Sequence, residues 1–142
     1  MATKADFTDE EWAFLHKGAA GSAMLVSLSD RDFTDTFGEA GAMAKYSASQ
    51  QTDAAPELIR ELARVRGTGF GLTTRPDVLR TETIAALRAT VTTLQAKSPT
   101  DLESYRTYVL GIAQAVADAK GGGMGQAEAA TIAEIKQALE GG

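Results

Sequence analysis

Apolar side chains recur at helical spacing from the start of the chain. Thr8 and Glu11 have the spacing of a capping box, in which each side chain accepts a hydrogen bond from the other residue's backbone amide. This pattern predicts a helix over residues 9–17, with Trp12 and Leu15 turned toward the protein interior.

Small residues dominate the next stretch and predict a second, separate helix. Gly18 and Gly21 are expected to break or bend the first helix, and a run rich in alanine, serine and glycine then continues to about Asp30. The apolar spacing predicts a third helix over residues 33–49 and a fourth over residues 56–65.

Three apolar seams follow the loop over residues 66–76. They predict helices over residues 77–97, from Ser98 and Pro99 to about Ala119, and over residues 127–139. The side chains expected to face inward are Val78, Leu79, Ile84, Leu87, Val91 and Leu94 in the first of these, Leu102, Tyr105, Val109, Ile112, Ala113 and Val116 in the second, and Ile132, Ile135 and Leu139 in the third. Tyr108 is expected at the border of its seam.

The whole pattern predicts an all-α protein. Six or seven helices and no strand are expected in a single compact domain over residues 1–142, with bundle-like or orthogonal packing. Residues 1–7 and 140–142 are expected to be frayed ends.

The composition agrees with a soluble globular protein. The chain has 142 residues, 44% of them apolar and 23% charged, and it has no cysteine. The missing cysteine excludes disulfides, thiolate metal ligands and thiol nucleophiles. No signal peptide is indicated, because the first residues lack a basic stretch followed by an apolar run. No membrane insertion is indicated either, because the longest uncharged run falls short of the about 20 residues that span a bilayer, so we expect a cytoplasmic location.

Charge is distributed unevenly along the chain. The net charge is −5, with an acidic excess over residues 1–39 and a basic excess over residues 57–88. An acidic chain disfavours non-specific nucleic-acid binding, which depends on neutralising phosphates. The asymmetry fits solvated helix faces best, and guidance of self-association is the alternative.

The glycine-rich stretch over residues 121–125 invites a phosphate-binding interpretation. A P-loop needs a lysine followed by serine or threonine, and this stretch has neither. The dinucleotide fingerprint also fails, because Gln126 replaces its third glycine and no strand precedes it. The stretch is better explained as a helix end followed by a turn.

Acidic residues 30–35 invite a calcium interpretation. An EF-hand needs glycine at the sixth position and glutamate at the twelfth, where this chain has Asp35 and Gly41. An acidic helix N-terminus explains the cluster more simply. His16, the only histidine, is interpreted as a surface or half-buried helix residue, because no nucleophile can be placed beside it.

Residues 111–139 carry a family resemblance. Their two alanine-rich helices around a glycine turn resemble the C-terminal helix–loop–helix of the TerB-like (tellurite-resistance B) family. The resemblance implies an all-helical fold with two such units, whose turns hold acids that bind calcium-like cations in some members. On this alignment Asp118 matches the turn aspartate, Glu128 the glutamate that opens the next helix, and Asp30 the aspartate of the first unit. Arg31 replaces the glycine of the first turn, and added glycines lengthen the second.

Three functions are therefore expected. The first is a non-enzymatic, stress-associated module that binds an unknown protein partner or a second copy of itself. The second is a divalent-cation protein with Asp30, Asp118 and Glu128 as ligands, and no other cofactor is expected. The third is a binder of an apolar ligand between the helices, beside Met24, Phe37 and Met43. An enzyme is the least favoured class, because no catalytic pair is positioned by the sequence.

Overall fold

The computed structural model describes residues 4–28, 45–46, 48–50, 56–64, 75–118 and 126–140. These residues form helices and turns and no strand, so the predicted all-α class is confirmed for this part of the chain. Within these ranges the elements are a 3₁₀ turn (Lys4–Asp6) and the helices α1 (Asp9–Leu28), α3 (Glu57–Ala63), α4 (Pro76–Lys97), α5 (Pro99–Asp118) and α6 (Gln126–Leu139). Of the predicted third helix, only residues 45–46 and 48–49 are described, and these are helical.

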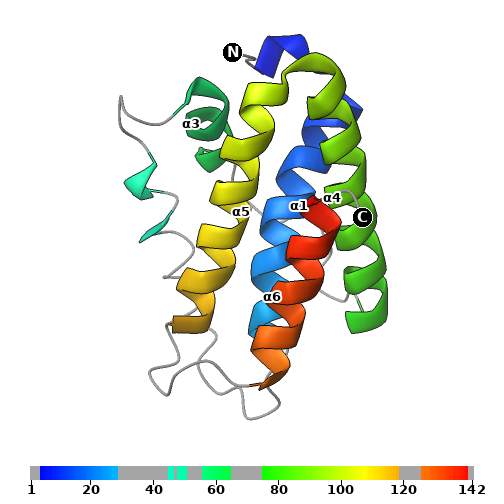
Figure 1. The fold of residues 1–142 in the computed structure, drawn as a ribbon, viewed down its shortest axis with the longest axis vertical. Coiled ribbons are helices and arrows are strands. Elements are labelled where there is room, and N and C mark those ends of the chain that lie inside the picture. The colour runs from blue at the N-terminus through cyan, green and yellow to red at the C-terminus, as the bar shows by residue number, and fades with distance from the viewer. Residues whose placement is uncertain are drawn as a thin grey trace.

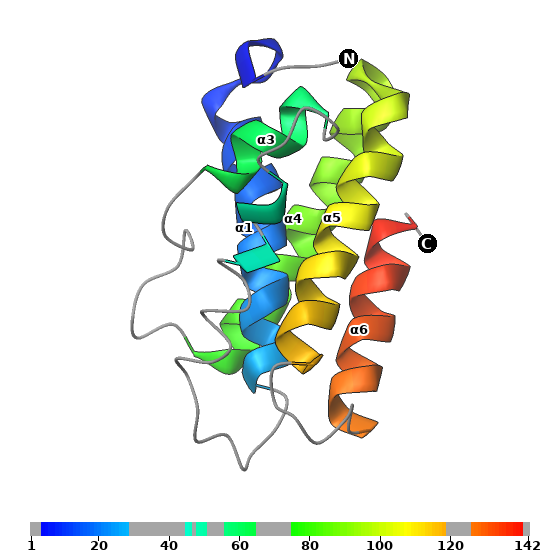
Figure 2. The same cartoon turned by 90° about the vertical axis from the view of Figure 1, so that its left-hand side faces the viewer.

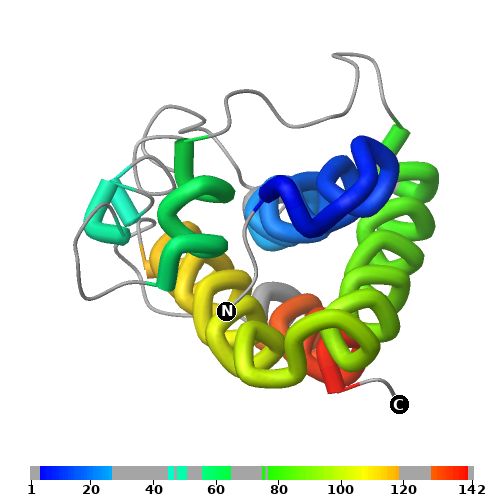
Figure 3. Tube along the Cα trace, turned by 90° about the horizontal axis from the view of Figure 1, so that it is seen from above, coloured from blue at the N-terminus to red at the C-terminus, as the bar shows by residue number. Residues whose placement is uncertain are grey.

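The four long helices form a bundle. They alternate in direction, with α1 and α5 running down and α4 and α6 running up in Figure 1. Helix α1 packs against α4, α5 and α6, while α6 also packs against α4 and α5. Figures 2 and 3 show α1 and α6 on opposite sides of the bundle, with the short helix α3 beside α5.

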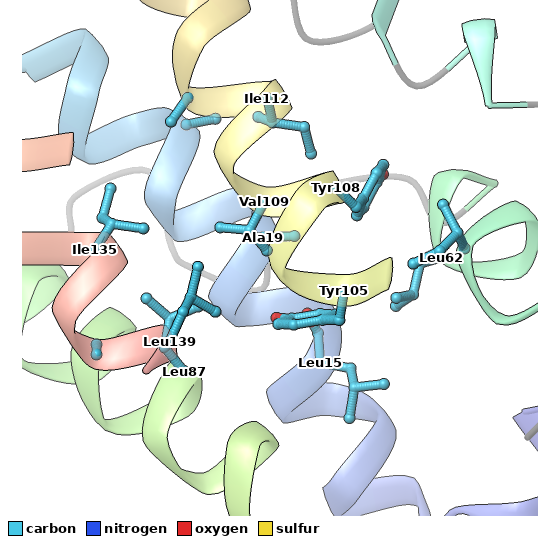
Figure 4. Close-up of a cluster of buried hydrophobic side chains, with 14 of the residues drawn as sticks. Leu15, Ala19, Leu62, Leu87, Tyr105, Tyr108, Val109, Ile112, Ile135 and Leu139 are labelled. Atoms are coloured by element: carbon cyan, nitrogen blue, oxygen red, sulfur yellow. The ribbon is translucent and has the colours of Figure 1, made fainter. Parts of the chain in front are cut away.

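The centre of the bundle is filled by side chains from all four long helices. Leu15 of α1, Leu87 of α4, Tyr105 of α5 and Leu139 of α6, all labelled in Figure 4, belong to one cluster of buried side chains, and each is at most 1% exposed. The predicted seam of α5 is confirmed, because all six of its side chains are buried. Burial of this kind of apolar surface is the main source of stability, at about 25 cal/mol per Å².

The predicted break in the first helix is wrong. Helix α1 continues without interruption from Asp9 to Leu28, through both Gly18 and Gly21. Both glycines are buried, and a methyl group at either would collide with a neighbouring helix: Leu87 and Tyr105 face Gly18, and Thr83 faces Gly21. Glycine therefore permits close helix packing here, and the free energy of that packing outweighs the low helix propensity of glycine.

Two other side chains differ from their predicted positions. Val78 was expected inside but is 43% exposed, because it lies on the outer side of the first turn of α4. Tyr108 was expected at a border but is buried, with its ring 6.0 Å from that of Tyr46.

The predicted starts of the helices at Asp9 and Pro99 are confirmed. The Thr8 amide donates to Glu11 Oε1 at 2.8 Å, and the Glu11 amide donates to Thr8 Oγ1 at 3.1 Å, as a capping box requires. Pro99 is the first residue of α5, and the Ser98 hydroxyl donates to the buried carboxylate of Asp101 at 2.8 Å. These local contacts set the ends of the helices that form the bundle.

Candidate functional site

Of the three predicted metal ligands, the structure describes only Asp118 together with its side chain. Asp118, the last residue of α5, is exposed, and its Oδ1 accepts a hydrogen bond from Gln114 Nε2 at 2.9 Å. Glu128 lies in the first turn of α6, but its side chain is outside the described residues, as is all of Asp30. The three-residue metal site stays a prediction.

Metal binding elsewhere can be judged only for the described residues. Among them, no group of three histidine, cysteine or acidic side chains is placed to hold a metal ion. Of the three residues expected beside an apolar ligand, Met24 is half-buried, while Phe37 and Met43 lie outside the described residues. His16 is half-buried on α1, in agreement with its predicted role.

The two α5 tyrosines are core residues. Tyr105 is fully buried, and its hydroxyl donates to the Leu15 carbonyl oxygen at 2.7 Å. This burial raises the pKa of Tyr105 far above its ordinary value, so the phenol stays neutral. Both rings are enclosed by other helices and are therefore not available to stack on nucleic-acid bases.

The surface is hollowed where α5 and α6 lie side by side. We call this hollow the α5–α6 groove, and its volume is about 340 Å³. It is lined by Glu103, Arg106, Thr107, Leu110, Lys136, Leu139 and Glu140. The α5 residues recur at intervals of three and four along one helix face, as do the α6 residues, so two helical stripes form the two walls.

Arg106 fixes the geometry of the groove. Its Nε donates to the Leu139 carbonyl oxygen at 2.7 Å, and its guanidinium group pairs with Glu103 one turn earlier on α5. The last carbonyl groups of a helix lack partners within the helix and carry partial negative charge. Arg106 therefore caps the C-terminal end of α6 and links it to α5.

The remaining groove charges are exposed. Lys136 and Glu140 lie one turn apart beside the half-buried Leu110, and their side chains are open to solvent. The groove thus combines an apolar surface with exposed side chains of opposite charge. Such a site can hold an amphipathic side-chain pattern, because the apolar surface contributes affinity and the charges fix orientation.

Among the residues that line the groove, no hydroxyl nucleophile is paired with a histidine base. Its one hydroxyl belongs to Thr107, and none of the groove residues is a histidine that could act as its base. Leu110 was the one signal of this site in the sequence, since it is a large apolar residue that lies outside the predicted buried seam of its helix. Its pairing with residues of α6 could not be read from spacing within α5.

Comparison with protein-family models finds no match for this chain, and comparisons with curated proteins and with solved structures find none either. None of the helices in the described ranges combines the length and apolar character needed to cross a bilayer.

Proposed function

We propose that this protein is a non-catalytic helical module that binds a protein partner through the α5–α6 groove. The single observation that carries the proposal is the groove itself, with an apolar surface at Leu110 and exposed opposite charges at Lys136 and Glu140. A cytoplasmic, stress-associated role and a TerB-like fold, which the family resemblance implies, belong to the same proposal.

The groove favours one kind of occupant. A volume of about 340 Å³ is at the low end of the roughly 300–1,000 Å³ of ligand pockets, and it suits a few side chains of a longer segment. We infer that the partner presents a short amphipathic helix with an apolar residue facing Leu110. An acidic residue of that helix faces Lys136, and a basic residue one turn away faces Glu140. A helix has this spacing between residues i and i+4.

Site-specific photocrosslinking in living cells tests this proposal. A photoreactive amino acid replaces Thr107 in the groove wall, and a matched variant carries it at Thr92, which is exposed on the outer face of α4. We expect a discrete adduct from position 107 and none from position 92. Mass spectrometry of the adduct should identify a segment with the predicted apolar, acidic and basic spacing.

Charge reversal tests whether the groove recognises that segment. Lys136→Glu should weaken the adduct at position 107, because the acidic residue of the partner would then face a like charge. Arg88→Glu, an equal charge change at an exposed position of α4, should leave the adduct unchanged. Equal labelling at positions 107 and 92 would refute the groove as the binding site. If the adduct contains a second copy of this chain, the groove mediates self-association and does not bind a different protein.

A further inference from the structure

The residues before α1 fold over the end of the bundle. We call residues 4–8 the N-terminal latch; it comprises the 3₁₀ turn Lys4–Asp6 together with Phe7 and Thr8. Figures 1 and 2 show this segment at the same end of the molecule as the connection between α4 and α5. It contacts α1, α3 and α4, which are far apart in the sequence.

One ammonium group contacts two parts of the latch and the helix that follows it. Lys97, the last residue of α4, donates from Nζ to the Asp6 carbonyl oxygen at 3.0 Å and to Glu11 Oε1 at 2.6 Å. The same Nζ lies 5.4 Å from the centre of the Phe7 ring, within the range of a cation–π interaction. Lys97 therefore joins the end of α4 to both the latch and the start of α1.

Aromatic rings make the apolar part of the same contact. The Phe7 and Trp12 rings lie 6.3 Å apart, and each residue is only 9% exposed. Lys4 Nζ lies 5.6 Å from the centre of the Trp12 ring, and the Lys4 amide donates to Glu61 Oε2 of α3 at 2.6 Å. The latch thus covers one side of Trp12.

The latch is held differently from the bundle that it covers. The turn Lys4–Asp6 buries none of its own side chains and is held by hydrogen bonds near the surface, so Phe7 is the one residue of the latch that joins the hydrophobic core. Water can replace such contacts at small cost. Beyond Trp12, by contrast, α1 buries Leu15 and Ala19 among the other long helices. A segment with few buried apolar contacts can open while the core stays folded.

We propose that residues 4–8 act as a latch that Lys97 holds closed and that opens as a unit. Opening moves Phe7 away and uncovers one face of Trp12, while the four-helix bundle stays folded. The fold therefore contains a conformational switch whose closed state depends on the charge of one lysine. This inference does not depend on the α5–α6 groove, because no residue of the latch lines that groove.

Amide hydrogen exchange in the full chain, followed residue by residue by NMR, tests the latch. The Phe7 amide donates to the Lys4 carbonyl oxygen at 3.2 Å and the Thr8 amide donates to Glu11, so both exchange when the latch opens. In Lys97→Met, exchange at these two amides should rise about fivefold, because the variant lacks the charge and the donors of Lys97. Exchange at the α1 amides of Leu15 and Ala19 should not change.

Two controls separate charge from side-chain size and position. Lys97→Arg keeps the positive charge and should retain most of the protection of the latch amides. Lys136→Met makes the same chemical change at an exposed lysine in the α5–α6 groove and should leave the latch unaffected. Acrylamide quenching of Trp12, the only tryptophan, gives an independent readout of exposure.

Two results would overturn the proposal. Unchanged exchange at Phe7 and Thr8 in Lys97→Met would show that Lys97 does not hold the latch. An equal rise at Leu15 and Ala19 would show that the segment opens only when the whole bundle unfolds. If Lys97→Met does not fold, Glu11→Gln removes the same ion pair from its other end. Exchange at Phe7 compared with Leu15 and Ala19 then decides, because the Thr8 amide donates to Glu11 itself.

Discussion

The contact between α1 and α4 at Gly21 gives a sharp test of how the bundle is held together. A Cβ atom added at Gly21 would lie 3.0 Å from both Cβ and Cγ2 of Thr83, and closer still to its Oγ1. Both residues are buried, and Thr83 has no exposed surface. Gly21→Ala should therefore force α1 and α4 apart.

The expected free-energy change combines two opposing effects. Alanine is better than glycine in a helix interior by about 1 kcal/mol. Overpacking a core typically costs about 1–3 kcal/mol, and the upper end applies here. Rotation of the Thr83 side chain can move Oγ1 and Cγ2, but its Cβ is attached directly to the α4 backbone. We therefore expect Gly21→Ala to lower the free energy of unfolding by about 2 kcal/mol.

Urea denaturation followed by far-UV circular dichroism measures this change, and a double-mutant cycle assigns it to Thr83. The Thr83 hydroxyl is buried without a hydrogen-bond partner, so Thr83→Ala should cost no more than about 1 kcal/mol by itself. Thr83→Ala removes Oγ1 and Cγ2 but keeps Cβ, so it should recover about half of the stability lost in Gly21→Ala, with a coupling energy of about 1 kcal/mol. A stabilising Gly21→Ala substitution, or additive effects of the two substitutions, would refute close packing at this position.

Three further predictions follow from single contacts. Tyr105→Phe removes the hydrogen bond to the Leu15 carbonyl and should lower the free energy of unfolding by about 1 kcal/mol in the same denaturation assay. Gly111→Ala should displace the Tyr46 ring, whose Cε2 would lie 2.8 Å from the new Cβ. Because burial raises the pKa of Tyr46, spectrophotometric titration should show that pKa falling toward 10. The hydrogen bond from the lysine at the end of α4, followed by that from the Thr8 amide, lowers the pKa of Glu11 below its ordinary value of 4.5. This carboxylate therefore stabilises the folded protein at pH values above the pKa that it has in the unfolded chain, and the stabilisation is lost as the pH falls through its lower pKa in the folded protein. Glu11→Gln should accordingly destabilise the protein at neutral pH but not in strong acid.

Much of the fold could be predicted because its signals are local. Helix α5 depends on a proline at its first position and on apolar residues at helical spacing, and both signals lie within about 20 residues. The capping box before α1 is equally local, since it joins two residues three positions apart. These signals determine where a helix begins and which face it buries.

The groove could not be predicted from the sequence, because the contacts that form it are not local. Its walls come from two helices, and the bond from Arg106 to the Leu139 carbonyl joins residues 33 positions apart. Periodicity within α5 identifies the face of Arg106 and Leu110 but not the helix beside it. The latch has the same character, because Lys97 reaches Asp6 across 91 positions of sequence.

The sequence by itself determined the helical class, most helix ends and the buried faces of the longer helices, because backbone capping and apolar periodicity act between near neighbours. Only the tertiary structure decided that α1 runs unbroken through its glycines, because Leu87, Tyr105 and Thr83 occupy the space that larger side chains would need. The tertiary structure alone also created the α5–α6 groove and the N-terminal latch. Both depend on contacts between helices, whose partners local sequence patterns do not specify.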